Sequence, residues 1–498
     1  MNTGRLLSAL AILAVLFVGC VKAPPPTTPQ IDVDTPDDWS ARDEIAGAVE
    51  TKWWDGFGDA HLAALVEIAL EENTDLWAAA ARVDRAAAEA RIAGADLKPR
   101  VNAGIDVSRQ KFSPSLFGQS PDDAQPGGFG STTFTRYGLS LDVAWEVDLW
   151  GRLRAGARAA LLQAQAVDAD FAAAKLSIAG QTAKTWFAVE EALQQVELAR
   201  SSAESFRKLS EQVRVRYEMG IRPPLDLRLA LSNEAGAEAL LQRRQRQLDG
   251  ALRQLEILLA RYPSAALLER YPSAGLPDLA APVPAGLPAE IVSRRPDLVA
   301  AERRLMANDQ QLLAARRALY PRLSLTGSGG SLALEIADLI DGDFGVWTLA
   351  ANLVQPIFEG GRLRAGVDAA AAGSDETFAQ YVTAVLRAYG EVETALAAEA
   401  YLTARAGHLE EAATQLVAAQ RIAEDRYREG LGGYLVVLES QTRALLAQSE
   451  LLVVRRELLE NRVDLHLALG GGFDYPAPGT DSEPDTVETA QIAEESAP

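Results

Sequence analysis

The stretch GRLRAG at residues 151–156 occurs again, letter for letter, at residues 361–366. The two copies are 210 positions apart, and VRYEMG at 215–220 corresponds to DRYREG at 425–430 with the same offset. Two matches that share one offset indicate a repeat much longer than six residues. A period of this length favours a duplicated half-protein over a solenoid of short units.

The register between the two halves changes once. LKPRV at 97–101 corresponds to LYPRL at 319–323 with an offset of 222, which is 12 more than 210. The first half therefore holds 12 additional residues, and residues 111–131 indicate where they fall, in a long polar loop. Each half has the same predicted order: a helix, two strands around a loop, GRLRAG, a long helix, a turn and a return helix.

The composition limits the class of protein. The chain has 498 residues with 48% hydrophobic residues, enough to build large folded units. A net charge of −21 argues against a nucleic-acid partner, because nucleic acids bind basic faces. One Cys excludes a disulfide within the chain, and one Cys with three His argues against a zinc site.

The first twenty residues, MNTGRLLSALAILAVLFVGC, indicate export. Arg5 precedes an apolar run over 6–18 that is too short to span a membrane and suits a signal peptide. Gly19 before the only Cys resembles the bacterial lipobox, although Phe17 stands where Leu is usual. The resemblance implies a lipoprotein signal peptide over 1–19 and a covalent lipid, such as palmitate, on Cys20. An ordinary signal with an incidental Cys is the alternative.

The residues after Cys20 support an anchored protein. Val21 stands where the same resemblance associates Asp with retention in the inner membrane, so transfer to the outer membrane is favoured. Residues 20–52 begin with a Pro-rich stretch and predict an extended, lipidated tether.

The helical segments are long, and Pro296 is the one internal Pro among them. Residues 60–97 and 288–318 are predicted as helices, and 152–216 and 362–426 as helices of 65 residues that span roughly 98 Å each. In the second return helix, leucines recur every seven residues and predict a coiled-coil seam with Leu435 and Val463 beside it. The leucines are Leu438, Leu445, Leu452 and Leu459. Taken alone, these helices favour a soluble rod.

Four segments alternate apolar and polar residues, and they fall in the hairpins 101–146 and 322–355. Alternation with aromatic residues at strand ends suits membrane strands that are apolar towards lipid. A half-buried soluble sheet is the alternative for any single strand. No later stretch of about 18 apolar residues offers a membrane helix, so spanning a bilayer requires closed β-strands. Four strands cannot close a barrel. Two copies provide eight strands, which leave an interior filled by side chains, and three provide twelve, so the geometry prefers a trimer or larger over a monomer or dimer.

Five segments resemble TolC-like outer-membrane factors, in particular the lipoprotein branch that is OprM-like and NodT-like. They are residues 53–86, 286–305, 320–330, 355–366 and 426–446. The resemblance covers roughly residues 50–472. It implies an α+β membrane protein: a trimeric twelve-stranded barrel in the bacterial outer membrane, continued by a tube of long coiled-coil helices through the periplasm.

The resemblance also implies the function. The chain is expected to be the passive exit duct of a tripartite efflux pump for drugs or other small molecules. Its expected partners are two further copies, a periplasmic adaptor, an inner-membrane pump of the resistance–nodulation–division class and outer-membrane lipid. An export channel for proteins and a lipid-tethered structural coiled coil are the alternatives. An enzyme is disfavoured, because the sequence contains no GxSxG, P-loop or HExxH motif.

Three groups of residues follow as candidate sites. By resemblance, Leu435 corresponds to an apolar constriction of the periplasmic gate and Glu439 to an acidic ring, although a seam residue and a solvated face are the alternatives. The predicted hairpin-tip contacts are Arg216, Tyr217, Asp226, Arg426 and Tyr427. The predicted barrel-to-tube joints are Gly151, Arg152 and Arg154 in the first half and Gly361, Arg362 and Arg364 in the second. No metal or further cofactor is expected.

The predicted organisation has six parts. They are the signal peptide 1–19, the tether 20–52, the first repeat 53–260 with return helix 226–260, a Pro-rich equatorial linker 261–287, the second repeat 288–472 with return helix 434–469, and an acidic disordered tail 473–498.

Overall fold

The structure is a computed structural model that describes residues 39–41, 52–112, 132–278, 283 and 291–471. The predicted signal peptide, Cys20, most of the tether, nearly all of the polar loop and the whole acidic tail lie outside the described residues. The chain divides into two compact units, one of which contains the strands with the adjoining parts of α3, α4, α8 and α9. The other contains the remaining helices.

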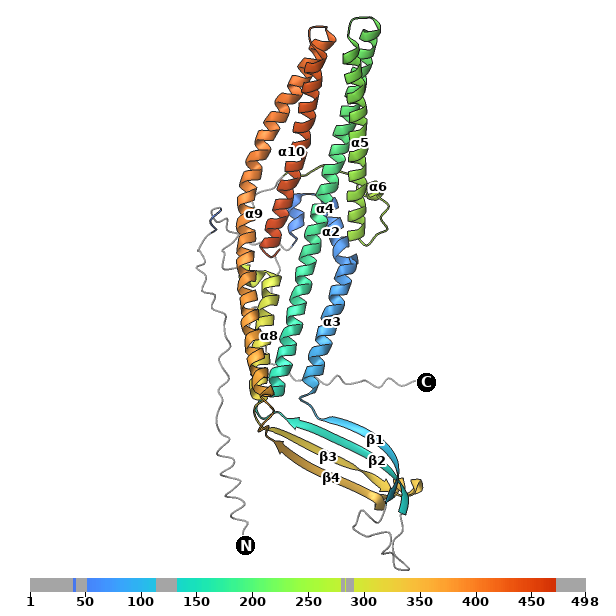
Figure 1. The fold of residues 1–498 in the computed structure, drawn as a ribbon, viewed down its shortest axis with the longest axis vertical. Helices are drawn as coiled ribbons and strands as arrows, with labels where there is room; N and C mark the ends of the chain where they lie inside the picture. Colours follow the sequence, from blue (N-terminus) through green and yellow to red (C-terminus); the bar gives the residue numbers. More distant parts are fainter. Residues whose placement is uncertain (1–38, 42–51, 113–131, 279–282, 284–290, 472–498) are drawn as a thin grey trace, which may run out of the picture. The chain divides into compact units, whose positions relative to one another are not determined.

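The strands form one antiparallel sheet in the order β1-β2-β3-β4 (Figure 1). The two strands of each half lie next to each other, and β2 pairs with β3 across the halves. The strands are β1 Arg100–Phe112, β2 Thr132–Val147, β3 Arg322–Ala333 and β4 Gly345–Val354. Two short 3-10 helices, η5 Ile336–Ile340 and η6 Gly342–Phe344, connect β3 to β4.

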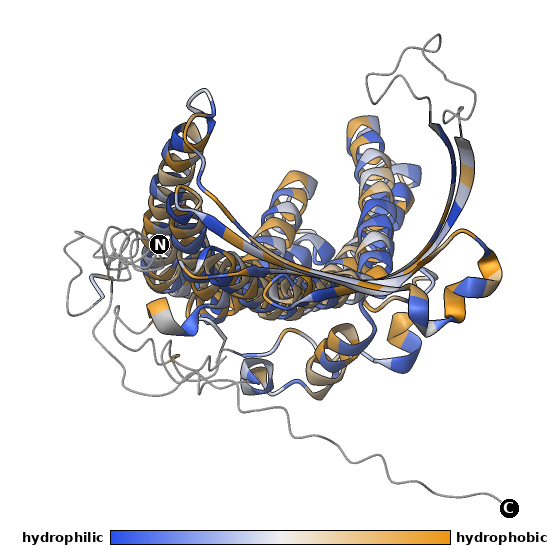
Figure 2. Cartoon of the chain, turned by 90° about the horizontal axis from the view of Figure 1, so that it is seen from below, coloured by the Kyte–Doolittle hydropathy of each residue, from blue (hydrophilic) through white to orange (hydrophobic). Residues whose placement is uncertain are grey.

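The pairing register gives the sheet two different faces. Ile105 lies opposite Leu139 on one face, which also carries Trp347 and Leu349. These apolar side chains are exposed, with fractions of 77% for Ile105, 78% for Trp347 and 77% for Leu349. The other face is polar and carries, across the four strands, Asn102, Asp142, Ser328 and Thr348. Figure 2 shows the sheet as a curved surface.

The helices repeat with the offset that the sequence shows. The long helices are α4 Arg152–Glu218 and α9 Arg362–Arg428, of 67 residues each. The return helices are α5 Pro224–Leu258 and α10 Tyr434–Ala468, of 35 residues each. Each pair begins 210 positions apart, so the fold is a duplicated half-protein. No helix in the described part of the chain combines the length and apolar character that crossing a bilayer requires.

The helix predicted over 60–97 is wrong at one point, because the chain breaks at Asn73 into α2 Ala60–Glu72 and α3 Thr74–Ala95. The Asn73 side-chain oxygen accepts hydrogen bonds from the amides of Asp75 at 2.9 Å and Leu76 at 3.2 Å. Asn competes with the helical backbone in this way and favours a helix start over a helix interior.

The single helix predicted over 288–318 is wrong at Arg295, where the short helix α7 Ile291–Arg294 has ended and α8 Pro296–Arg317 has not begun. Proline fits the first turn of a helix, where its missing N–H would have had no helical partner.

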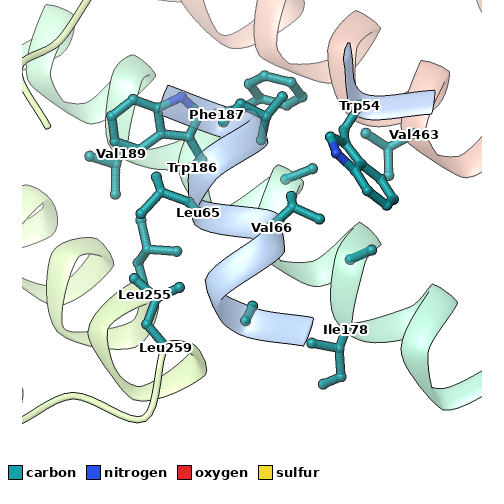
Figure 3. Packing of buried hydrophobic residues seen from close by; sticks show 14 of the residues in the cluster. Trp54, Leu65, Val66, Ile178, Trp186, Phe187, Val189, Leu255, Leu259 and Val463 are labelled. Carbon is teal, nitrogen blue, oxygen red and sulfur yellow. The ribbon is translucent and has the colours of Figure 1, made fainter. Parts of the chain in front are cut away.

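The main hydrophobic core lies in the second unit (Figure 3). It combines the 3-10 helix η1 Trp53–Phe57 with α2, α4, α5 and α10. Trp186 and Phe187 on α4 are fully buried. The indole of Trp186 donates to Asp59 at 2.7 Å, and the other oxygen of Asp59 caps the start of α2. One carboxylate thus ties the first helix of the repeat to the long helix.

Two buried carboxylates hold the linker that follows the first repeat. Glu256 on α5 accepts hydrogen bonds from the amides of Ala265 at 2.7 Å and Ala266 at 3.0 Å. Glu190 on α4 accepts from the Ser273 hydroxyl at 2.5 Å and the Gly275 amide at 3.0 Å. Burial raises the pKa of Glu190, and these hydrogen bonds act in the opposite direction.

The predicted leucine seam is only partly correct. Leu459 is buried, but Leu438, Leu445 and Leu452 are half-buried, and Leu435 is 60% exposed. The buried stripe of α10 instead contains Tyr434, Val437, Gln441, Ala444, Val454, Leu458, Arg462 and Leu465. Ala and Val alternate in this stripe with larger side chains such as Tyr434, Gln441 and Arg462.

Candidate functional site

The two helical hairpins turn in the same way at their tips. Gly220 and Gly430 have φ of 70° and 82°, a left-handed conformation that glycine adopts without strain. The amide after each glycine, that of Ile221 or Leu431, donates at 2.8 Å to the carbonyl five residues earlier. This is the glycine-terminated end that many helices use. The duplication therefore extends to the hydrogen bonds of the turns.

Arg216 at the end of α4 joins the two hairpins. Its guanidinium donates to the backbone carbonyls of Tyr427 at 3.0 Å and Arg428 at 3.1 Å, at the end of α9. The same guanidinium lies 4.4 Å from the centre of the Tyr427 ring. The carbonyls at a helix end carry partial negative charge, so a cation is stabilised there.

Two further polar contacts link the hairpins. Arg222 donates to the carbonyl of Gly432 at 3.3 Å, and the amide of Asn233 donates to the Tyr434 hydroxyl at 3.3 Å. Asp226 lies 3.9 Å from Arg222 within the first hairpin. Donors from the first repeat thus meet acceptors of the second repeat.

The predicted tip contacts occupy different environments. Tyr427 is buried at 1% exposure, whereas Tyr217 is 39% exposed and Arg426 is exposed. Within the chain, the structure brings Arg216 and Tyr427 together but pairs Asp226 with Arg222. Contacts of Arg426, Tyr427 or Asp226 with a neighbouring chain stay a prediction.

An apolar cluster supports these polar contacts. It draws residues from all four hairpin helices: Leu209, Val213, Ala230, Ala423, Tyr427, Tyr434 and Val437. The rings of Tyr427 and Tyr434 meet edge-on at 6.4 Å. The two hairpins therefore pack as one body at their tips.

The two predicted gate residues lie on the other side of α10. Leu435 is 60% exposed, and the Glu439 carboxylate is 62% exposed and 2.6 Å from the Arg443 guanidinium. With 100° of rotation per residue, Leu435 and Glu439 are about 40° apart, and they point away from buried Val437 and Gln441. Within the chain, Leu435 therefore lies outside the buried stripe and Glu439 is exposed beside Arg443, and the gate roles of both residues stay predictions.

Glycine occupies both junctions between strand and long helix. Gly151 has a φ of 79° and Gly361 a φ of 86°. The carbonyl of Gly151 accepts a hydrogen bond from Arg317 at 2.8 Å, and a Cβ at Gly151 would lie 2.6 Å from that guanidinium. A Cβ at Gly361 would meet nothing within 4 Å. The first junction is thus closed by α8, and the second is open.

The arginines of the first junction are paired with acids that the sequence analysis did not select. Asp148 caps α4 by accepting from the amides of Leu153 at 3.1 Å and Arg154 at 2.9 Å. Burial acts to raise the pKa of Asp148, but these hydrogen bonds and the Arg154 guanidinium outweigh it and lower the pKa. Arg152 pairs with Glu146 at 2.7 Å.

The second junction is simpler. Arg362 forms an ion pair with Glu359, three residues earlier, and Arg364 is exposed. The charges of Arg152, Arg154 and Arg362 at the two junctions are therefore partly neutralised by neighbouring carboxylates. A carboxylate placed just before the helix was the signal that would have predicted this pairing.

Comparison with known proteins shows the family. The family model described as outer membrane efflux protein matches residues 65–261 and 287–471, which is most of the chain. The chain belongs to the outer membrane efflux protein family.

Similar proteins cover nearly the whole chain. The pyoverdine export outer membrane protein OpmQ of Pseudomonas putida is 32% identical over 456 residues, which are 91% of this chain and 95% of OpmQ. OprJ of Pseudomonas aeruginosa is 32% identical over 93% of this chain and 95% of OprJ. The toluene efflux pump outer membrane protein TtgC of Pseudomonas putida is 30% identical over 97% of this chain and 99% of TtgC.

Solved structures agree with the fold. A membrane protein from Pseudomonas aeruginosa superposes with a TM-score of 0.81 at 31% identity, over 91% of this chain and 98% of that protein. The outer-membrane channel OprN gives a TM-score of 0.82 at 27% identity, over 91% of this chain and 99% of OprN. The chain is therefore an efflux protein of the outer membrane with the TolC-like fold.

Sequence reasoning missed one buried charge of this efflux protein. Arg295, only 8% exposed, donates to Asp297 at 3.0 and 2.8 Å, to Glu391 at 2.7 Å and to the Ala468 carbonyl at 3.1 Å. Burial acts to lower the pKa of Arg295, but the two carboxylates outweigh burial and raise the pKa. Arg295 thus joins the start of α8 to α9 and to the end of α10, so the sequence RRPD at residues 294–297 has a structural role. Among the described residues, no cluster of His, Cys, Asp or Glu could hold a metal ion.

Proposed function

We propose that three copies of this chain form the exit duct of a tripartite efflux pump, with twelve strands closed in the outer membrane and the long helices continuing into the periplasm. The observation that carries the proposal is the four-stranded sheet. Its edge strands β1 and β4 have no further strand to pair with among the described residues, and one face is apolar and exposed. When the sheets of three chains close into one barrel, each edge strand finds a hydrogen-bonding partner, and the apolar face is covered by lipid.

The cargo class follows from the relatives. OpmQ is named for pyoverdine export and TtgC for toluene efflux, so small molecules are the proposed cargo. We propose that the duct is passive and performs no catalysis, as expected of a relative of export and efflux proteins. An inner-membrane pump of the resistance–nodulation–division class would supply the energy, and a periplasmic adaptor would join that pump to the hairpin tips.

The duct is tested with the full-length protein. We expect a trimer on native gels that dissociates on heating, discrete conductance in planar bilayers, and restored drug resistance in a strain that lacks its own outer-membrane efflux proteins but keeps pump and adaptor. A monomer without conductance would contradict the duct. Resistance that is restored in the absence of the pump would contradict the tripartite arrangement.

We further propose that Leu435 and Glu439 close the periplasmic end. Both side chains are exposed on the face of α10 opposite the buried stripe, which leaves them available to a shared axis. Three leucines would form an apolar constriction, and three carboxylates one turn away would repel each other and attract cations.

The gate is tested by combining Leu435→Ala with Glu439→Gln. We expect more frequent channel openings and greater uptake of large antibiotics, because both the constriction and the acidic ring are lost. Leu446→Ala is the matched control, since Leu446 is 63% exposed on the same helix. Single-channel current and antibiotic uptake equal to those of the control would exclude the gate.

We propose that the mature protein is also anchored by a lipid on Cys20. Cys20→Ala is expected to abolish incorporation of labelled palmitate, while trimer formation remains. Labelling that persists in Cys20→Ala would exclude this lipid site.

A further inference from the structure

The three described residues of the N-terminal segment that precede residue 52 lie on helix α9. The Trp39 side chain is 5% exposed, and its ring meets the Tyr389 ring edge-on at 6.3 Å and 62°. The amide of Ser40 donates to one Glu393 oxygen at 2.7 Å, and the amide of Ala41 donates to the other at 2.9 Å. We call Trp39, Ser40 and Ala41 the N-terminal clip.

The chemistry of the clip is selective. A carboxylate that receives two consecutive backbone amides, one on each oxygen, holds the backbone with two charge-assisted hydrogen bonds, and the Trp39 ring against Tyr389 sets the register because amides are present at every residue. Tyr389 and Glu393 are four residues apart and lie on one face of the helix. The aromatic contact adds the burial of an indole, among the largest apolar surfaces that a side chain can offer.

We propose that Tyr389 and Glu393 form a docking site for the N-terminal segment, which fixes the tether to α9 and so sets the point from which the lipid on Cys20 is held. The docking site stands on the contacts above, whereas its use as a lipid anchor rests on the proposed lipidation of Cys20.

The chain lengths are compatible with this use. Nineteen residue steps separate Cys20 from Trp39, which extend to at most about 65 Å. Along α9, Glu393 is 31 residues after Arg362, which is about 47 Å of helix. The tether is therefore long enough for a lipid near the start of α9 and too short for one much farther away.

The site is tested by amide hydrogen exchange on the full-length protein in detergent. In Glu393→Ala, the amides of Ser40 and Ala41 are expected to exchange about tenfold faster, because both acceptors are lost. Trp39→Ala provides an independent variant, and Glu411→Ala is the control, since Glu411 is exposed on the same helix and lies outside the clip. Core amides of α9 report whether each variant is folded.

Trypsin cleavage after Arg42 gives a second measurement, because a protease must bind the residues before the cut in an extended form. We expect faster cleavage in Glu393→Ala and Trp39→Ala than in the wild type and in Glu411→Ala. Unchanged exchange and unchanged cleavage in both folded variants would overturn the docking site. A docking site that is intact in Cys20→Ala while palmitate labelling persists would instead refute only the lipid assignment.

Discussion

Removal of the Arg216 guanidinium should loosen the two hairpins from each other. Arg216 makes two charge-assisted hydrogen bonds to carbonyls at the end of α9 and lies over the Tyr427 ring. Because the side chain is only half-buried, we take about 0.7 kcal/mol for each hydrogen bond and about 0.5 kcal/mol for the ring contact. The sum of about 2 kcal/mol corresponds to a change of about 30-fold in the balance between joined and separated tips.

The assay is the open probability of single channels in planar bilayers, with antibiotic uptake as the cellular counterpart. We expect Arg216→Ala to open more often. Arg216→Lys should lie in between, because an ammonium keeps the charge but lacks the planar fork that reaches two carbonyls. Arg214→Ala is the control, since Arg214 is exposed and pairs within its own helix with Glu211 at 3.3 Å.

The reasoning would be refuted by an Arg216→Ala channel with the open probability and uptake of Arg214→Ala. An equal increase of open probability in Arg216→Ala and Arg214→Ala would also refute it. The cause would then be the loss of a positive charge near the tips and not the loss of the contact with Tyr427. Trimer formation on native gels, measured in parallel, separates a loosened tip from a failure to assemble.

Two predictions concern stability. His466 stacks on Trp53, and burial, followed by the charge of Arg462, lowers its pKa from 6.5 to about 4. Between pH 6.5 and pH 4 the unfolded chain therefore binds a proton that the folded chain does not. About 3 kcal/mol of the stability present at neutral pH should be lost as the pH falls over that range. Denaturant unfolding should show this pH dependence in the wild type but not in His466→Phe, and equal slopes would contradict it. Arg295→Met should lower the free energy of unfolding by about 2 to 3 kcal/mol, somewhat less than is usual when one partner of a fully buried ion pair is removed, because Glu391 is 44% exposed. Arg421→Met is the control, because Arg421 is exposed on α9. A loss of stability no larger than that of Arg421→Met would count against the role of Arg295.

The sequence predicted well what depends on local pattern. GRLRAG and the two RY-containing turns located the duplication, because each marks a change of backbone direction that only certain residues permit. The strands alternate with period two, so their faces could be assigned before their pairing was known. The break at Asn73 was missed because a single polar residue inside a helical pattern has no periodic signature.

Contacts to backbone carbonyls were beyond sequence reasoning. Arg216, Arg222 and Arg295 all donate to carbonyls of distant segments, and a carbonyl is present at every residue, so no residue type marks the acceptor. The heptad of leucines misled for a related reason. Periodicity identifies a stripe, but which stripe is buried depends on the neighbouring helices, and here the buried face includes Tyr434, Gln441 and Arg462 beside Ala and Val.

The duplication also explains why the proposed gate is only threefold. With the offset of 210, Leu435 corresponds to Leu225, which is 64% exposed, and Glu439 corresponds to Leu229, which packs against the tip cluster. The first repeat therefore supplies an apolar side chain at both positions. Three chains would therefore place three Glu439 carboxylates in the ring instead of six. Such a ring would attract cations, and the repulsion among its carboxylates, which opposes closure, would be weaker than in a ring of six. The contact of Arg216 with α9 acts within one chain, because it holds the hairpin with leucines at these two positions against the hairpin that bears Glu439.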